Sequence, residues 1–60
     1  KGKVMIGYNA RIGSHTTIMP GITIGENAII GANSFVTKDV PKNTFFAGCP
    51  AKLIKELQDE

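Results

Sequence analysis

A strict six-residue repeat is the feature of this sequence that most constrains its fold. β-branched aliphatic residues recur at every sixth position, at Ile6, Ile12, Ile18, Ile24, Ile30 and Val36. A helix has a period of about 3.6 residues and a flat strand a period of about two, so neither explains this spacing alone. The repeat therefore indicates short units that stack on one another, as in a solenoid.

A second series, three positions after each aliphatic residue, predicts a regular change in chain direction. Its members are Asn9, His15, Gly21, Asn27, Asn33 and Asp39. Gly, Asn, Asp and His are the residue types that best tolerate positive φ. We therefore expect a corner with a left-handed backbone conformation at each of these positions, so that three hexads close one triangular coil.

Stacked coils of this kind form an all-β parallel β-helix, which we predict as about two coils over residues 1–41. Neighbouring strands lie about 4.8 Å apart, so residues that differ by three hexads should lie above one another. This places the aliphatic residues in three inner columns, which pair Ile6 with Ile24, Ile12 with Ile30, and Ile18 with Val36.

The pattern changes after Pro41, and we expect residues 42–60 to form a second part of the same single domain. Residues 42–48 are predicted as an extended exit segment that contains Phe45 and Phe46. A short C-terminal α-helix should follow, because Pro50 suits a first helical turn and three apolar residues would share one face. These residues are Leu53, Ile54 and Leu57.

Size and charge limit what the chain can do alone. A chain of 60 residues buries only about 60% of its unfolded surface, and its single cysteine, Cys49, excludes an internal disulfide. We therefore expect a partner chain to stabilise it.

A net charge of +2 is too small to indicate nucleic acid, and no apolar run is long enough to span a membrane. One free cysteine favours a reducing, cytoplasmic location. The chain opens at Lys1 without an initiator Met, which suggests a fragment, a processed chain or a trimmed sequence.

Two segments match a known family. The repeats IGYNAR, IGSHTT, IMPGIT, IGENAI and IGANSF are followed by VTKDVPKNTFFAGCPAKLIKEL. They resemble the hexapeptide-repeat acetyltransferases, most closely the maltose, galactoside and streptogramin O-acetyltransferases. The resemblance covers nearly the whole chain and implies a left-handed coil, acetyl-CoA as the donor, and a sugar or similar hydroxyl as the acceptor. It also implies a homotrimer with active sites between neighbouring subunits.

The resemblance also implies which residues contact the donor: Ser14, Ala32, Thr37, Lys38, Lys52 and Lys55. Ser14 and Ala32 are three hexads apart and should share one edge, where small residues would let a pantetheine arm approach the backbone. A tight edge alone would select small residues as well. Lys38, Lys52 and Lys55 could contact the phosphates of coenzyme A or remain solvated. Arg11 stands where the family often has an aromatic residue, which weakens one expected stacking contact.

His15 is the only histidine and could act as a general base. It also occupies a corner position, and we favour this second interpretation of why a histidine stands there. The resemblance implies a catalytic histidine that lies upstream of Lys1. We therefore expect no catalytic residue in this chain and no acetyl transfer by residues 1–60 alone. We expect no metal, because zinc catalysis needs three or four protein ligands. The alternatives are a serine acetyltransferase-like enzyme and a non-catalytic structural β-helix.

Overall fold

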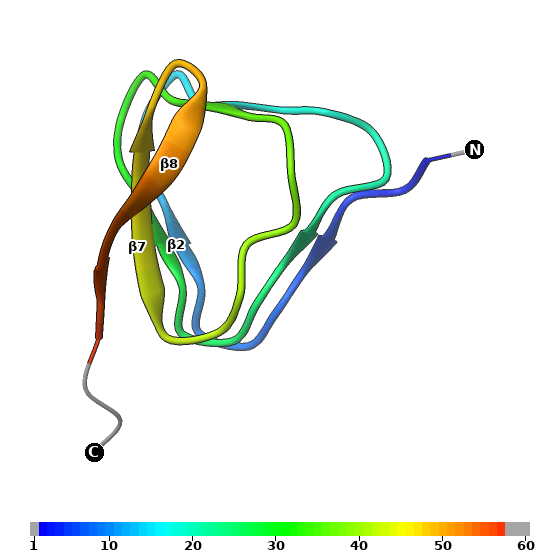
Figure 1. Ribbon diagram of the computed structural model, residues 1–60. Coiled ribbons are helices and arrows are strands. Elements are labelled where there is room, and N and C mark those ends of the chain that lie inside the picture. The colour runs from blue at the N-terminus through cyan, green and yellow to red at the C-terminus, as the bar shows by residue number, and fades with distance from the viewer. Residues whose placement is uncertain (1, 58–60) are drawn as a thin grey trace.

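The computed structural model describes residues 2–57 and shows eight β-strands and no helix in this range. Six strands contain two residues each: β1 (Met5–Ile6), β2 (Arg11–Ile12), β3 (Thr17–Ile18), β4 (Thr23–Ile24), β5 (Ile29–Ile30) and β6 (Phe35–Val36). Two longer strands follow, β7 (Thr44–Gly48) and β8 (Ala51–Glu56). The chain winds around a triangular prism, and each short strand lies on one of its three faces (Figure 1).

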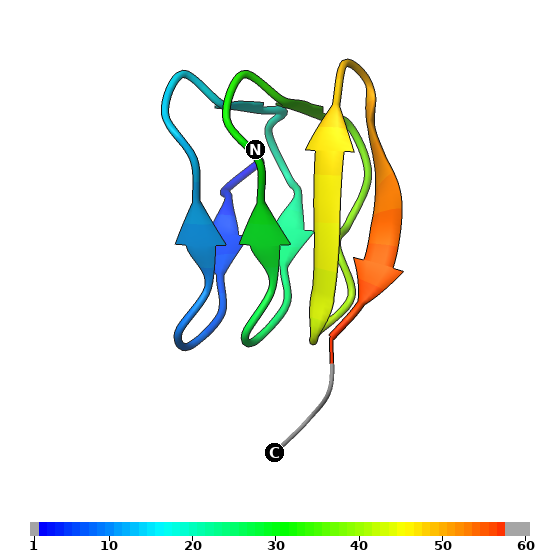
Figure 2. The same ribbon diagram turned by 90° about the vertical axis from the view of Figure 1, so that its left-hand side faces the viewer.

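Each face of the prism is a sheet built from strands of successive coils. β1 pairs with β4 and β3 with β6, both parallel, while the third sheet has the order β2-β5-β7-β8. Figure 2 shows the four strands of this third sheet side by side. The predicted columns are confirmed, because the observed partners are Ile6 and Ile24, Ile12 and Ile30, and Ile18 and Val36.

The core is centred on the second coil. Ile24, Ile30 and Val36 come from three different faces and are at most 1% exposed. Burying such a side chain stabilises the fold by about 1.5–3 kcal/mol. Ile6 occupies the same position in the first coil but is 53% exposed, so the first coil contributes less to the core.

Three columns of corners join the sheets. Corner A comprises residues 7–10, 25–28 and 41–44; corner B comprises residues 13–16 and 31–34; corner C comprises residues 19–22 and 37–40. Positive φ is observed at five of the predicted positions: Asn9, His15, Gly21, Asn27 and Asn33. The prediction for Asp39 was wrong, because Asp39 does not have positive φ and its carboxylate instead accepts a hydrogen bond from the Thr23 N–H at 2.9 Å.

The second coil, counted from Ile24 to its partner Val40, is two residues shorter than the first, which runs from Ile6 to Ile24. Phe46 pairs with Ile30, and Val40 bridges to Ile24, so both partners are 16 residues apart instead of 18. The missing residues belong to corner C, where residues 37–40 pass inside the corner formed by residues 19–22 (Figure 1). The next left-handed corner is therefore Asn43, with φ of 55°, which a fixed six-residue frame does not predict.

The predicted C-terminal helix was wrong, because residues 51–56 form β8, which runs antiparallel to β7. Leu53 pairs with Phe46 and Lys55 pairs with Phe45, which leaves Ile54 as an extra residue in a β-bulge. The bulge accommodates the consecutive apolar residues Leu53 and Ile54 in a strand, and pairing with β7 overrides helix propensity. The described residues contain no helix that could cross a membrane.

Candidate functional site

Corner B brings Ser14 and Ala32 together, as predicted. The Ser14 carbonyl accepts a 2.9 Å hydrogen bond from the Asn33 N–H, so the two corners stack directly. Both side chains are exposed. Corner B therefore presents a narrow line of small side chains and backbone on the outside of the prism.

The small residues at corner B are not required by the corner geometry. The same position of corner A, directly after its glycine, holds Tyr8 and Glu26 in successive coils. Tyr8 is 81% exposed, which shows that the position accepts a large side chain that points into solvent. Between the two explanations for Ser14 and Ala32, this comparison favours access to the backbone over a tight edge.

Two side-chain hydroxyl groups, one half-buried and one buried, support corner B. Thr16 and Ser34 both donate to the Gly31 carbonyl, at 3.1 Å and 2.7 Å. Ser34, which is 2% exposed, also accepts a 3.2 Å hydrogen bond from the Gly48 N–H at the end of β7. This network joins corner B to the β7–β8 turn, so the backbone beside Ala32 is fixed from two sides.

The bulge in β8 places Lys52 and Lys55 on one face of the four-stranded sheet. Lys52 pairs with Ala47 and Lys55 with Phe45. Residues two apart in a strand point to the same side, so both lysines share the outer face with these partners. Arg11 lies in the same cross-strand row as Phe45, so this face carries a third cation at the position where the family often has an aromatic residue.

Thr37 and Lys38 lie elsewhere, at corner C. Both are exposed and follow β6 directly. The β3–β6 sheet separates corner C from corner B (Figure 1). The six predicted donor contacts therefore form two groups in one chain: Ser14, Ala32, Lys52 and Lys55 around corner B and its adjoining sheet, and Thr37 with Lys38 at corner C.

His15 occupies the corner position that the sequence predicts. It is exposed and has φ of 59°, close to the values of its equivalents Asn9, Asn27 and Asn33. Its conformation therefore needs no catalytic explanation. Within residues 2–57, no group of three or more His, Cys, Asp or Glu side chains is arranged to hold a metal ion.

The catalytic histidine that the resemblance implies has no counterpart in this chain other than His15. Its expected place is upstream of Lys1, and Lys1 itself lies outside the residues that the structure describes. The expectation that the general base precedes Lys1 therefore stays a prediction.

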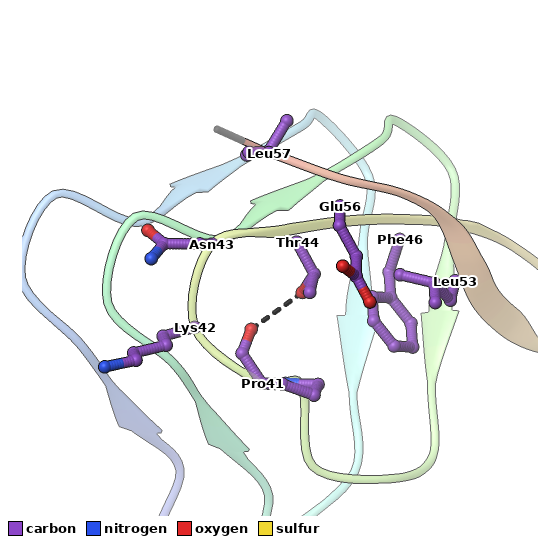
Figure 3. A pocket seen from close by; sticks show the side chains of 8 residues that line it. All are labelled: Pro41, Lys42, Asn43, Thr44, Phe46, Leu53, Glu56 and Leu57. Atoms are coloured by element: carbon purple, nitrogen blue, oxygen red, sulfur yellow. Dashed lines mark hydrogen bonds between the residues drawn. The ribbon is translucent and has the colours of Figure 1, made fainter. Parts of the chain in front are cut away.

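A cavity of about 340 Å³ lies beside β7 and β8. Figure 3 shows the Phe46 ring and the Leu53 side chain on one side and the Thr44 hydroxyl donating to the Pro41 carbonyl. The lining contains none of the six predicted donor contacts; it consists of Pro41, Lys42, Asn43, Thr44, Phe46, Leu53, Glu56 and Leu57. The cavity is therefore not the predicted donor site.

Comparison with known proteins identifies the family. Residues 3–38 match the sequence profile described as bacterial transferase hexapeptide (six repeats). The chain belongs to this hexapeptide transferase family. The predicted fold class, a left-handed parallel β-helix, is confirmed by the solved structures of similar proteins.

Three solved structures show how closely the hexapeptide transferase chain follows known members. A maltose O-acetyltransferase from Clostridium difficile 630 is 52% identical with a TM-score of 0.91, over 93% of this chain and 30% of its own. A galactoside acetyltransferase in complex with coenzyme A is 54% identical with a TM-score of 0.90, over 93% and 28%. The serine acetyltransferase of Neisseria gonorrhoeae is 37% identical with a TM-score of 0.92, over 98% and 23%. The chain thus spans less than a third of the length of the relatives that it matches.

Proposed function

We propose that this chain is the C-terminal, donor-binding part of an acetyl-CoA-dependent O-acetyltransferase that acts on a sugar or a similar hydroxyl acceptor. The observation that supports this most strongly is the 54% identity to a galactoside acetyltransferase whose structure contains coenzyme A. The small side chains of corner B and the lysines of β8 fit a donor that has an extended arm and phosphate groups. A cytoplasmic location is part of the proposal, since an exposed free Cys49 fits a reducing compartment.

The role of this chain in the reaction is to bind and orient the donor. In acetyl transfer, the acceptor oxygen bonds to the thioester carbonyl carbon, the C–S bond breaks, and the proton of the hydroxyl passes to a general base. We propose that this base is a histidine upstream of Lys1 and that the thiolate of coenzyme A is protonated on release. Holding the donor in one geometry lowers the entropic part of the barrier.

The two groups of donor contacts support a shared site between neighbouring copies. Corner B and the outer face of β8 would contact the donor from one subunit, and corner C would contact it from the next. A homotrimer would form three such sites, and its interfaces would also stabilise a chain this small.

A serine acetyltransferase is the second candidate, because one such enzyme is 37% identical to this chain with a TM-score of 0.92. Serine also offers a hydroxyl acceptor, so the donor contacts would be shared. The two candidates are separated by measuring acetyl transfer to galactosides, maltose and serine, with the release of free thiol as the readout. Preferred turnover of serine would overturn the sugar assignment and leave the donor assignment intact.

Calorimetric titration with coenzyme A tests the donor assignment, using the protein expressed from its complete gene. Lys38→Ala and Lys52→Ala should each weaken binding about fivefold, because an exposed charge pair contributes up to about 1 kcal/mol. Lys42→Ala is the matched control, since Lys42 is an exposed lysine at corner A and should leave affinity unchanged. If all three variants bind coenzyme A as tightly as the wild type, Lys38 and Lys52 are not donor contacts.

A further inference from the structure

We propose that Asp39 is a positioning residue that holds Lys38 in place for the donor. This inference rests on the proposed function, because it assumes that Lys38 contacts coenzyme A. It assigns to the Asp39 side chain a role that belongs to the peptide backbone elsewhere in the fold.

The hydrogen bond between Thr23 and Asp39 departs from the ladder pattern that links the first coil to the second on all three faces. The first residue of each strand in the first coil donates its N–H to a backbone carbonyl of the second coil: Met5 to Ile22, Arg11 to Ala28, and Thr17 to Ser34. Thr23 begins the equivalent strand of the second coil, yet its N–H donates to the Asp39 carboxylate at 2.9 Å. A side-chain oxygen thus takes the place of a main-chain carbonyl.

The carboxylate replaces the backbone carbonyl at corner C, where the second coil is two residues shorter than the first. If the 16-residue offset of the third coil applied here, the carbonyl of Lys38 would be the acceptor for the Thr23 N–H. Because the Asp39 carboxylate occupies that position, the backbone of Lys38 need not turn toward the sheet. The carboxylate therefore completes the hydrogen-bond ladder while the side chains of Thr37 and Lys38 remain exposed.

Both ends of the Thr37–Lys38 segment are fixed. On one side, Val36 is 1% exposed and its carbonyl accepts a 3.0 Å hydrogen bond from the Met19 N–H. On the other side, Val40 is 2% exposed, and its N–H donates to the Thr23 carbonyl at 2.9 Å. The Asp39 carboxylate accepts from the N–H of the same Thr23, so Asp39 and Val40 together bind both backbone polar groups of Thr23.

The side chain of Asp39 is exposed, so its removal should loosen the segment without disrupting the core. Water can satisfy the Thr23 N–H, while Val36 and Val40 remain buried. Lys38 would then sample more conformations in the free protein, and ordering them on binding would reduce affinity. The expected result is weaker donor binding with little change in thermal stability.

Asp39→Ala and Asp39→Asn test this inference by calorimetric titration with coenzyme A and by thermal unfolding. Asp39→Ala should weaken binding three- to tenfold, with Tm nearly unchanged. Asp39→Asn should bind like the wild type, because its amide oxygen can still accept the Thr23 N–H. Both variants lose the same negative charge, so electrostatic attraction of phosphates cannot account for a difference between them.

A double-mutant cycle with Lys38→Ala shows whether Asp39 acts through Lys38. Asp39→Ala should have little further effect when Lys38 is already alanine. If Asp39→Ala does not fold, Asp39→Glu, which keeps the charge but displaces the oxygen, should show the same loss of affinity. Wild-type binding by Asp39→Ala, or equal losses in the alanine and asparagine variants, would overturn the inference. If Lys38→Ala itself has no effect, the donor assignment of Lys38 fails instead.

Discussion

The side-chain amide of Asn9 donates a 2.8 Å hydrogen bond to the side-chain oxygen of Asn27, its equivalent in the next coil. Both residues have positive φ, 63° and 62°. Asparagine at corner A therefore serves two purposes: it adopts the left-handed backbone conformation, and it links one coil to the next.

Asn27→Ala and Asn27→Gly should separate these two contributions. Both variants lose the amide hydrogen bond, but only alanine has a Cβ that disfavours positive φ, by about 1–2 kcal/mol. Glycine adopts this conformation freely but gains entropy in the unfolded chain. We expect Asn27→Ala to lower the free energy of unfolding by about 1 kcal/mol more than Asn27→Gly, measured by urea denaturation. Equal losses would show that backbone conformation contributes little at this corner.

Ala32→Tyr should impair donor binding without unfolding the chain. A tyrosine is already accommodated and exposed at the same position of corner A, at Tyr8, so the fold should tolerate it. At corner B the ring would cover the backbone that the donor is proposed to approach. Calorimetry should show at least tenfold weaker coenzyme A binding, which corresponds to about 1.4 kcal/mol.

Glu26→Tyr is the matched control for Ala32→Tyr, because it introduces the same side chain at corner A of the same coil. Its coenzyme A affinity should equal that of the wild type. If both tyrosine variants bind normally, the donor does not use corner B; if both bind weakly, a general effect on folding or assembly is responsible.

His15→Asn should leave both stability and acetyl transfer unchanged. Asparagine occupies the equivalent corner one coil later, at Asn33, with the same φ of 59°. We expect the free energy of unfolding to change by less than about 0.5 kcal/mol. Thiol release from acetyl-CoA by the protein expressed from its complete gene is the direct assay, and a loss of turnover in His15→Asn would identify His15 as the base.

The repeating part of the fold could be predicted because its rules are local. Each hexad specifies one inward aliphatic residue and one residue that tolerates positive φ, so the columns from Ile6 to Val36 follow from counting. The shortened coil could not be predicted in this way, because Asp39 fits the six-residue frame and Val40 is a plausible inner residue in either register. The bridge between Val40 and Ile24 and the pairing of Phe46 with Ile30 show which register is used.

The candidate site, like the fold, could be predicted only where it follows from the six-residue repeat. The stacking of Ser14 and Ala32 follows from the repeat, whereas the common face of Lys52 and Lys55 depends on the bulge at Ile54, which arises from pairing with β7. Arg11 was identified only as a departure from the family pattern and not as a member of the row that contains Phe45, because the inner columns alone do not indicate what the outer residue of each strand contacts. The alternation between outward Arg11 and inward Ile12 is the signal that could have found it.

The two-residue loss at corner C shows that this solenoid can change its perimeter at one vertex while its sheets keep their registry. Ile30 still aligns with Phe46 on the following face, so the altered circumference is absorbed before the next strand begins. Other members of the fold could therefore exchange the segment at this vertex for shorter or longer ones. The length and surface of corner C could then vary while the buried residues of the core stay the same.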